Sequence, residues 1–296
     1  MTIEIRSLDT VADMRAVEDL QRAVWGNNDA DIVPLHMLTT VAHNGGVLLG
    51  AWDAEEEKLV GFVFGFLGTD QENPKRPAMA NLKHCSHMLG VLPEYRDHGV
   101  GLKLKLAQRE RVMEQGVRLI TWTYDPVESR NAYLNIVRLG AICRTYLREV
   151  YGEMLDVLNK GLPSDRFQVE WWITSQRVKQ RLSGERRRLS LDSFASAGTP
   201  ILNPTRLNDS GLPQMAAQSP APGGVFALVE VPANFQILKV TDVGLAREWK
   251  LQVRAMFESA FVEGYIVTDF LHETVEGRER AFYVLSHGGA RLDGEE

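Results

Sequence analysis

Residues 89–116 constrain the fold of this chain more than any other segment. They read Leu-Gly-Val-Leu-Pro-Glu-Tyr-Arg-Asp-His-Gly-Val-Gly and continue to Gly116 without a further glycine or proline. This order predicts the end of an apolar strand, a tight turn and a helix. Gly99 and Gly101 have no Cβ, so the backbone can turn sharply there and approach a ligand closely. Because a helix start presents free N–H groups and a positive dipole end, the pattern predicts a site for a phosphate or pyrophosphate.

The segments around this turn predict an α/β sandwich with a mixed β-sheet. Residues 84–92 and 118–124 are expected to be strands, joined in parallel by a right-handed crossover through the helix. On that helix, Leu102, Leu106 and Met113 share one face. The remaining expected strands are 2–6, 47–52, 59–67, 141–151 and 167–173, and the remaining helices are 11–25, 34–42, 128–139 and 174–182.

The last third of the chain differs in composition. Residues 183–224 are rich in Pro, Ser, Ala and Gly, which predicts a linker or an irregular wrap. Residues 225–296 predict a C-terminal β-α-β-β extension, in which Asp242 is the N-cap of a helix over 242–263. The sequence therefore predicts a first domain over 1–182, a linker and an extension.

Composition limits the classes of partner. The net charge is −6 and the pI is near 5.7, which argues against a general nucleic-acid or anionic-membrane binder. The only cysteines, Cys85 and Cys143, indicate a reducing compartment. No signal peptide or membrane-spanning run is apparent, so a cytoplasmic protein is expected. No metal site is expected, because the spacing of His84 and His87 suits a helix rather than a strand and no third ligand is evident.

The turn also carries a family resemblance. The run from Arg96 through Gly99 to Gly101, placed after the fourth strand, resembles the signature of the GNAT superfamily of acyl-CoA-dependent N-acyltransferases. The lead-in over 91–95 is similar as well. A later set of residues matches the family's spacing upstream of the sixth strand: Ser129, Ala132, Arg138, Gly140 and Ala141. The resemblance covers residues 1–175.

The resemblance implies a GNAT-like fold that binds acetyl-CoA or another acyl-CoA. Backbone N–H groups of the turn would hold the pyrophosphate, and the main chain over 89–91 would pair with the pantetheine arm. One N–H group there would polarise the thioester carbonyl. The implied cofactor-binding residues are Leu89, Gly90, Val91, Arg96, Asp97, His98, Gly99, Val100, Gly101, Leu102, Ser129 and Asn131.

The implied reaction is direct attack of a primary amine, on a small molecule or a peptide, within a ternary complex. Many family members protonate the leaving thiolate with a tyrosine, but Ile136 occupies that position here. Tyr133 and Tyr124 are the alternative donors, or the thiolate leaves without help. For the base, His84 and His87 are the candidates, and strand alternation allows only one of them to face the substrate. Each is also readable as a packed or surface histidine.

Two functions follow from these observations. One is an N-acyltransferase, and the other is a non-catalytic CoA or acyl-CoA sensor that keeps the GNAT fold. The resemblance places acceptor recognition on 25–36, 69–77 and C-terminal additions. Residues 225–296 are expected to complete the sheet, to roof the acceptor site or to form a homodimer contact, and they resemble a degenerate half of a GNAT domain.

Overall fold

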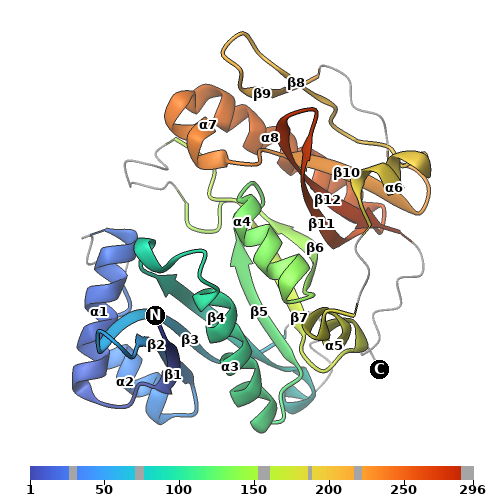
Figure 1. Ribbon diagram of the computed structural model, residues 1–296. Helices are drawn as coiled ribbons and strands as arrows, with labels where there is room; N and C mark the ends of the chain where they lie inside the picture. Colours follow the sequence, from blue (N-terminus) through green and yellow to red (C-terminus); the bar gives the residue numbers. More distant parts are fainter. Residues whose placement is uncertain (27–31, 71–76, 153–160, 186–188, 217–221, 288–296) are drawn as a thin grey trace. The chain divides into compact units, whose positions relative to one another are not determined.

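The computed structural model describes residues 1–26, 32–70, 77–152, 161–185, 189–216 and 222–287. The chain forms two compact units, Met1–Trp122 and Thr123–Glu296 (Figure 1). The residues around the glycine turn all belong to the first unit.

The first unit is built on a mixed sheet in the order β1 (Ile3–Ser7), β2 (Val47–Asp53), β3 (Lys58–Thr69), β4 (Leu82–Val91) and β5 (Leu119–Tyr124). The pairs β1–β2, β2–β3 and β3–β4 are antiparallel, whereas β4 and β5 are parallel. The connection between the parallel pair contains η3 (Pro93–Tyr95) and α3 (Val100–Glu114). The predicted fold class, a mixed sheet flanked by helices, is confirmed.

Helices cover both faces of this sheet. α1 (Val11–Trp25) lies over the face that carries Phe62, since a Cβ on Gly90 would come within 3.0 Å of the Trp25 ring and 2.9 Å of the Phe62 ring. α2 (Leu35–His43) packs against α1. α3 lies on the opposite face, where a Cβ on Gly61 would come within 3.2 Å of Leu104. The short helix η2 (Ala78–Asn81) precedes β4.

The buried face of α3 is not the one that carries Leu102, Leu106 and Met113. Leu102, Leu106 and Met113 are only partly buried. The buried row instead consists of Val100, Leu104, Gln108 and Val112, with Lys105 beside it. This row repeats every four residues. Its polar member Gln108, together with Lys105 beside it, hid the row from a search for apolar periodicity.

The start of α1 is fixed by a capping box. The Thr10 hydroxyl accepts a hydrogen bond from the Asp13 N–H at 3.1 Å, and the Asp13 carboxylate accepts one from the Thr10 N–H at 2.9 Å. Thr10→Ala should therefore lower the free energy of unfolding by about 1 kcal/mol. Thr10→Ser, which keeps the hydroxyl, should lower the free energy of unfolding by no more than about half as much. Urea unfolding followed by circular dichroism checks this, and equal stability of the alanine variant and the wild type would contradict the capping role.

The second unit contains an antiparallel sheet in the order β7 (Arg166–Trp172), β6 (Ile142–Leu147), β11 (Ile266–Val275), β12 (Arg278–Ser286) and β10 (Phe226–Val231). Val267 in β11 pairs with Cys143 in β6. Residues 225–287 therefore extend the sheet that β6 and β7 begin. The proposed domain boundaries at 182 and 224 stay a prediction, as does the relation to a half GNAT domain.

The remaining elements of the second unit are mostly helices. They are α4 (Ser129–Ala132), η4 (Tyr133–Arg138), α5 (Gln176–Ser183), α6 (Leu191–Ser196), α7 (Phe235–Thr241), α8 (Val243–Val262) and the hairpin of β8 (Thr205–Leu207) and β9 (Pro213–Met215). As predicted, the Asp242 side chain caps α8 by accepting from the Leu245 N–H. The helix predicted over 128–139 is α-helical only at its start, because η4 is a π-helix.

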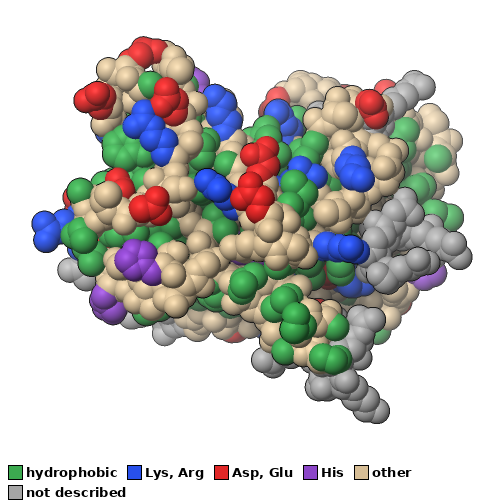
Figure 2. All heavy atoms as spheres, turned by 90° about the horizontal axis from the view of Figure 1, so that it is seen from below, with side chains coloured by type: hydrophobic (Ala, Val, Ile, Leu, Met, Phe, Trp, Pro, Cys, Tyr) green, Lys and Arg blue, Asp and Glu red, His purple; other side chains and the backbone are tan. Residues whose placement is uncertain are grey.

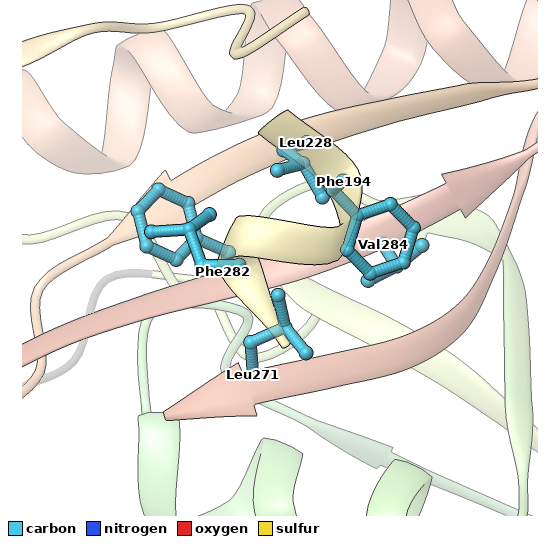
Figure 3. Packing of buried hydrophobic residues seen from close by; sticks show 6 residues of the cluster. Phe194, Leu228, Leu271, Phe282 and Val284 are labelled. Atoms are coloured by element: carbon cyan, nitrogen blue, oxygen red, sulfur yellow. The ribbon is translucent and has the colours of Figure 1, made fainter. Parts of the chain in front are cut away.

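The second unit has two groups of core side chains. Phe167 is fully buried and makes edge contacts with Phe257 and Tyr283 at ring distances of 4.7 and 5.5 Å. On another part of the sheet, Phe194 of α6 packs over Leu228, Leu271 and Phe282 (Figure 3). The segment predicted to be a linker thus contains a helix that contributes to a hydrophobic core.

Candidate functional site

The glycine turn joins β4 to α3 and is held from two sides. Arg96 donates through Nε to the Val91 carbonyl at 3.2 Å, which ties the turn to the end of β4. Tyr95 is buried and donates through its hydroxyl to the Glu56 carboxylate at 3.0 Å. Burial and this carboxylate raise the pKa of Tyr95 to about 12, so its hydroxyl keeps its proton. These contacts fix the backbone before Gly99.

Positive φ angles shape the turn itself. Asp97 has φ +67°, and Gly99 has φ +75° and ψ 7°, in the left-handed region that disfavours residues with a Cβ. Gly99 is the N-cap of α3 and has no side chain to offer the helix. The Gly99 carbonyl accepts the first helical bond of α3, from Lys103 at 3.0 Å. The N–H groups of Val100, Gly101 and Leu102 precede that bond and have no acceptor within the helix.

These N–H groups suit a phosphate ligand. They follow one another at the N-terminal end of a helix of 15 residues, where the helix dipole is positive. Asp97, His98 and Gly99 are exposed, so the turn is open to solvent. The structure therefore brings together six residues that the sequence analysis assigned to phosphate binding: Asp97, His98, Gly99, Val100, Gly101 and Leu102.

The second part of the site is an open edge of β4. Within the described first unit, the pairing of β4 with β5 covers only His84↔Ile120 and Cys85↔Thr121. Leu92 N–H donates to the Val60 carbonyl in β3 at 2.9 Å. Hydrogen-bonding direction alternates along an antiparallel strand, so Gly90 also faces β3 and the main-chain groups of Leu89 and Val91 face the opposite side. The Val91 carbonyl is the one that Arg96 binds, which agrees with this direction.

The open edge can pair with an extended polar chain. Leu89 offers a donor and an acceptor, and Val91 offers a donor, all along one strand edge. Gly90 lies between them under the rings of Trp25 and Phe62. The arrangement fits the pantetheine arm of CoA, which has amide groups and is extended, and it leaves an N–H group to polarise a carbonyl.

One of the two candidate bases, His87, is part of a β-bulge in β4. Phe64 pairs with Met88 and Gly65 with Ser86, so His87 is the extra residue. His87 lies on the face of Phe64 and Phe66, with ring distances of 6.0 and 6.1 Å, and it is exposed. Burial of part of the ring lowers the pKa of His87, so the neutral, proton-accepting form predominates near pH 7.

His84 lies on the opposite face and is completely buried beneath α3. Gln108 uses its carbonyl oxygen to accept from Ser86 Oγ at 3.0 Å and from Lys105 Nζ at 2.8 Å. Its amide nitrogen, 3.2 Å from His84 Nε2, must then be the donor, and the His84 proton resides on Nδ1. His84 therefore belongs to a buried polar cluster with Ser86, Lys105 and Gln108, and it has no access to solvent.

Lys105 marks the place where β4 and β5 separate. Its Nζ donates to Ser86 in β4 at 3.0 Å and lies 3.6 Å from the centre of the Trp122 ring in β5. Ser86 and Trp122 directly follow Cys85 and Thr121, the last residues that pair between the two strands. Burial lowers the pKa of Lys105 well below its ordinary value. The sequence analysis missed this cluster, and the spacing of four residues from Val100 to Val112 was the signal that pointed to it.

The cluster makes stability depend on pH. Burial first, and the charge of Lys105 second, lower the pKa of His84 from 6.5 to about 4. Below pH 6.5 the unfolded chain binds a proton that the folded chain does not, so stability falls as the pH drops from 6.5 toward 4. The loss attributable to His84 is about 3 kcal/mol. Urea unfolding at pH 7 and at pH 4.5 measures how much stability is lost on acidification, and about 2 kcal/mol of the wild-type loss should come from His84. The loss in His84→Leu should be smaller by that amount, and an unchanged loss would contradict the assignment.

Four predicted site residues lie in the second unit. Tyr124 and Tyr283 have hydroxyl oxygens 3.1 Å apart, and Tyr283 donates to the Pro126 carbonyl. The Tyr124 hydroxyl therefore donates a hydrogen bond to the Tyr283 oxygen, and burial raises the pKa of Tyr124 well above its ordinary value. The Ser129 hydroxyl donates to the Pro232 carbonyl at 2.5 Å, whereas Asn131 is exposed on α4.

The position that the resemblance implied for the acid is apolar. Ile136 is completely buried within η4, and Tyr133 at the start of η4 is partly buried. The roles of Tyr124, Tyr133, Ser129 and Asn131 stay predictions.

Other site classes find no support among the described residues. No group of three or more His, Cys, Asp or Glu side chains is placed to hold a metal ion. In the same residues, no helix has the length and apolar character needed to cross a membrane. On the face seen in Figure 2, the coloured Lys and Arg side chains are interspersed with Asp and Glu.

The chain resembles several solved N-acetyltransferases. The Escherichia coli ribosomal-protein-S18-alanine N-acetyltransferase has 16% identity and a TM-score of 0.44, over 58% of this chain and 94% of that one. An N-acetyltransferase from Staphylococcus aureus Mu50 has 16% identity and a TM-score of 0.45, over 59% of this chain and 100% of that one. Arabidopsis thaliana NAA60 in complex with acetyl-CoA has 18% identity and a TM-score of 0.46, over 58% of this chain and 99% of that one. No protein-family model and no curated protein matches the sequence.

Proposed function

We propose that this protein is an acyl-CoA-dependent N-acyltransferase of the GNAT type, using acetyl-CoA or another acyl-CoA. The observation that carries the proposal is the open edge of β4, which leads directly into a turn rich in free N–H groups. A turn alone would bind many phosphates. The edge adds main-chain groups at Leu89 and Val91 that suit a pantetheine arm, and this combination favours CoA over a simple nucleotide.

In the proposed reaction, an unprotonated primary amine attacks the thioester carbonyl. A C–N bond forms, the C–S bond breaks, and the sulfur leaves with the electron pair as a thiolate. The N–H group of Leu89 or Val91 stabilises the negative charge on the carbonyl oxygen. His87 takes the proton that the amine loses, because it is exposed and its lowered pKa keeps it neutral. His84 is left out of the proposal because it is buried on the other face.

The proposal needs no acid for the leaving group. Ile136 has no proton to donate, and the Tyr124 proton is engaged by Tyr283. A CoA thiolate is stable enough in water to leave without protonation, since an ordinary thiol has a pKa of about 8.5.

Acetyl-CoA is the probe that tests this function. The protein is titrated with acetyl-CoA and CoA by calorimetry and is then incubated with acetyl-CoA and a panel of amines. Released thiol and acylated amine are quantified together. Binding with equal amounts of thiol and acylated amine supports the enzyme. Binding without release from any amine favours the sensor, and failure to bind either compound overturns the proposal.

A further inference from the structure

A row of aromatic rings lies on the α1 face of the first unit, along β3 and next to β4. Trp25 meets Phe62 edge to face at 5.9 Å, and Phe64 lies 6.2 Å from Phe66. Phe62, Phe64 and Phe66 alternate along β3 and therefore share one face of the sheet. The row is continuous with the candidate site at both ends, because Trp25 covers Gly90 and His87 contacts Phe64 and Phe66.

The outer rings of this row are only partly buried. Phe62 and Phe64 are 0% and 2% exposed and belong to the core, whereas Trp25 is 44% exposed and Phe66 is 37% exposed. Leu67 and Leu82 are also exposed at this end of the sheet, but strand alternation places them on the opposite face, with His84. The partly open rings are thus the ones that lie beside the proposed base and the proposed acyl position.

We propose that the acceptor is a primary amine that carries an aromatic group. This inference rests on the proposed acyltransferase function. The ring packs against the exposed edge of Phe66, beside His87, while the amine nitrogen reaches the thioester held along Leu89 and Val91. His87 lies between these groups and receives the proton. Aromatic rings pair in edge-to-face and offset arrangements, which a row of rings in a pleated strand offers to a flat substrate.

The test compares one primary amine that has an aromatic ring with two primary amines of similar size that lack one. With acetyl-CoA as donor, kcat/KM is measured for 2-phenylethylamine, 2-cyclohexylethylamine and n-hexylamine. We expect a preference of at least about tenfold for phenylethylamine over hexylamine. Phe66→Ala should reduce that preference about tenfold, and Phe66→Tyr, which keeps the ring, should retain it. Leu82→Ala is the matched control, since Leu82 is 40% exposed but lies on the other face.

The outcomes separate this inference from the proposed function. Equal or faster turnover of 2-cyclohexylethylamine or n-hexylamine overturns the aromatic acceptor and leaves the acyltransferase in place. Loss of the preference in Leu82→Ala as well as in Phe66→Ala also overturns it, because the effect is then general. Absence of acetyl-CoA binding overturns the function itself. A preference lost only in Phe66→Ala, at unchanged acetyl-CoA affinity, supports the inference.

Discussion

Gly99→Val is expected to weaken acetyl-CoA binding at least about a hundredfold, the equivalent of losing one or two hydrogen bonds to charged groups. Gly99 has φ +75°, a conformation that a β-branched residue adopts only with strain. The turn will relax to relieve that strain, and the N–H groups of Val100, Gly101 and Leu102 will lose their common direction. Calorimetric titration with acetyl-CoA measures the effect.

Gly116 provides a matched control for this variant. It also has φ +75°, and a Cβ there, as at Gly99, would meet nothing within 4 Å. Gly116 lies at the other end of α3, so Gly116→Val should cost similar stability and leave the affinity unchanged. Gly99→Asn should keep the affinity within about tenfold, because asparagine tolerates the left-handed region. Equal affinities of Gly99→Val and Gly116→Val would show that the turn does not bind the phosphates.

His87→Gln is expected to lower kcat by about 10²–10⁴, the usual contribution of a general base, without changing acetyl-CoA affinity. Glutamine keeps the size and polarity of the side chain but cannot accept the proton. In the wild type, burial lowers the pKa of His87 below 6.5, so the histidine remains a base down to that pH and activity falls only as the pH drops further. Thiol release measured from pH 5 to pH 9 gives both kcat and the pH at which the activity falls.

Two comparisons make the His87 result specific. His43→Gln changes an exposed histidine on α2 and should leave kcat and the pH profile unchanged. In His87→Gln the fall of activity at low pH should flatten, because its titrating group is gone. A variant that retains the wild-type kcat and profile would show that another group, or water, accepts the proton.

The main features of the first unit could be predicted from sequence. The expected strands 47–52, 59–67 and 84–92 correspond to β2, β3 and β4, and the glycine turn lies where strand, turn and helix signals placed it. These signals are local: Gly99 needs a positive φ, and Gly116 ends α3 in the same conformation. Local backbone requirements leave a direct record in the residue type.

Features that depend on contacts between distant residues were harder to predict. Strand alternation placed His84 and His87 on opposite faces, but it did not tell which face is buried. That answer depends on Gln108 and Lys105, which come from α3 and interrupt its apolar pattern. The π-helix η4 and the bulge at His87 also follow from tertiary packing and have no simple sequence signal.

The most direct test of CoA binding at this site is a titration with acetyl-CoA observed by backbone amide NMR. The proposed site predicts that the largest shifts fall on the amides of Leu89 and Val91 and on those from Gly99 to Leu102, at one-to-one stoichiometry. In Gly99→Val the same amides should no longer respond to the ligand. Saturable shifts confined to other residues, or no shifts with excess acetyl-CoA, would contradict the placement of CoA along β4 and the glycine turn.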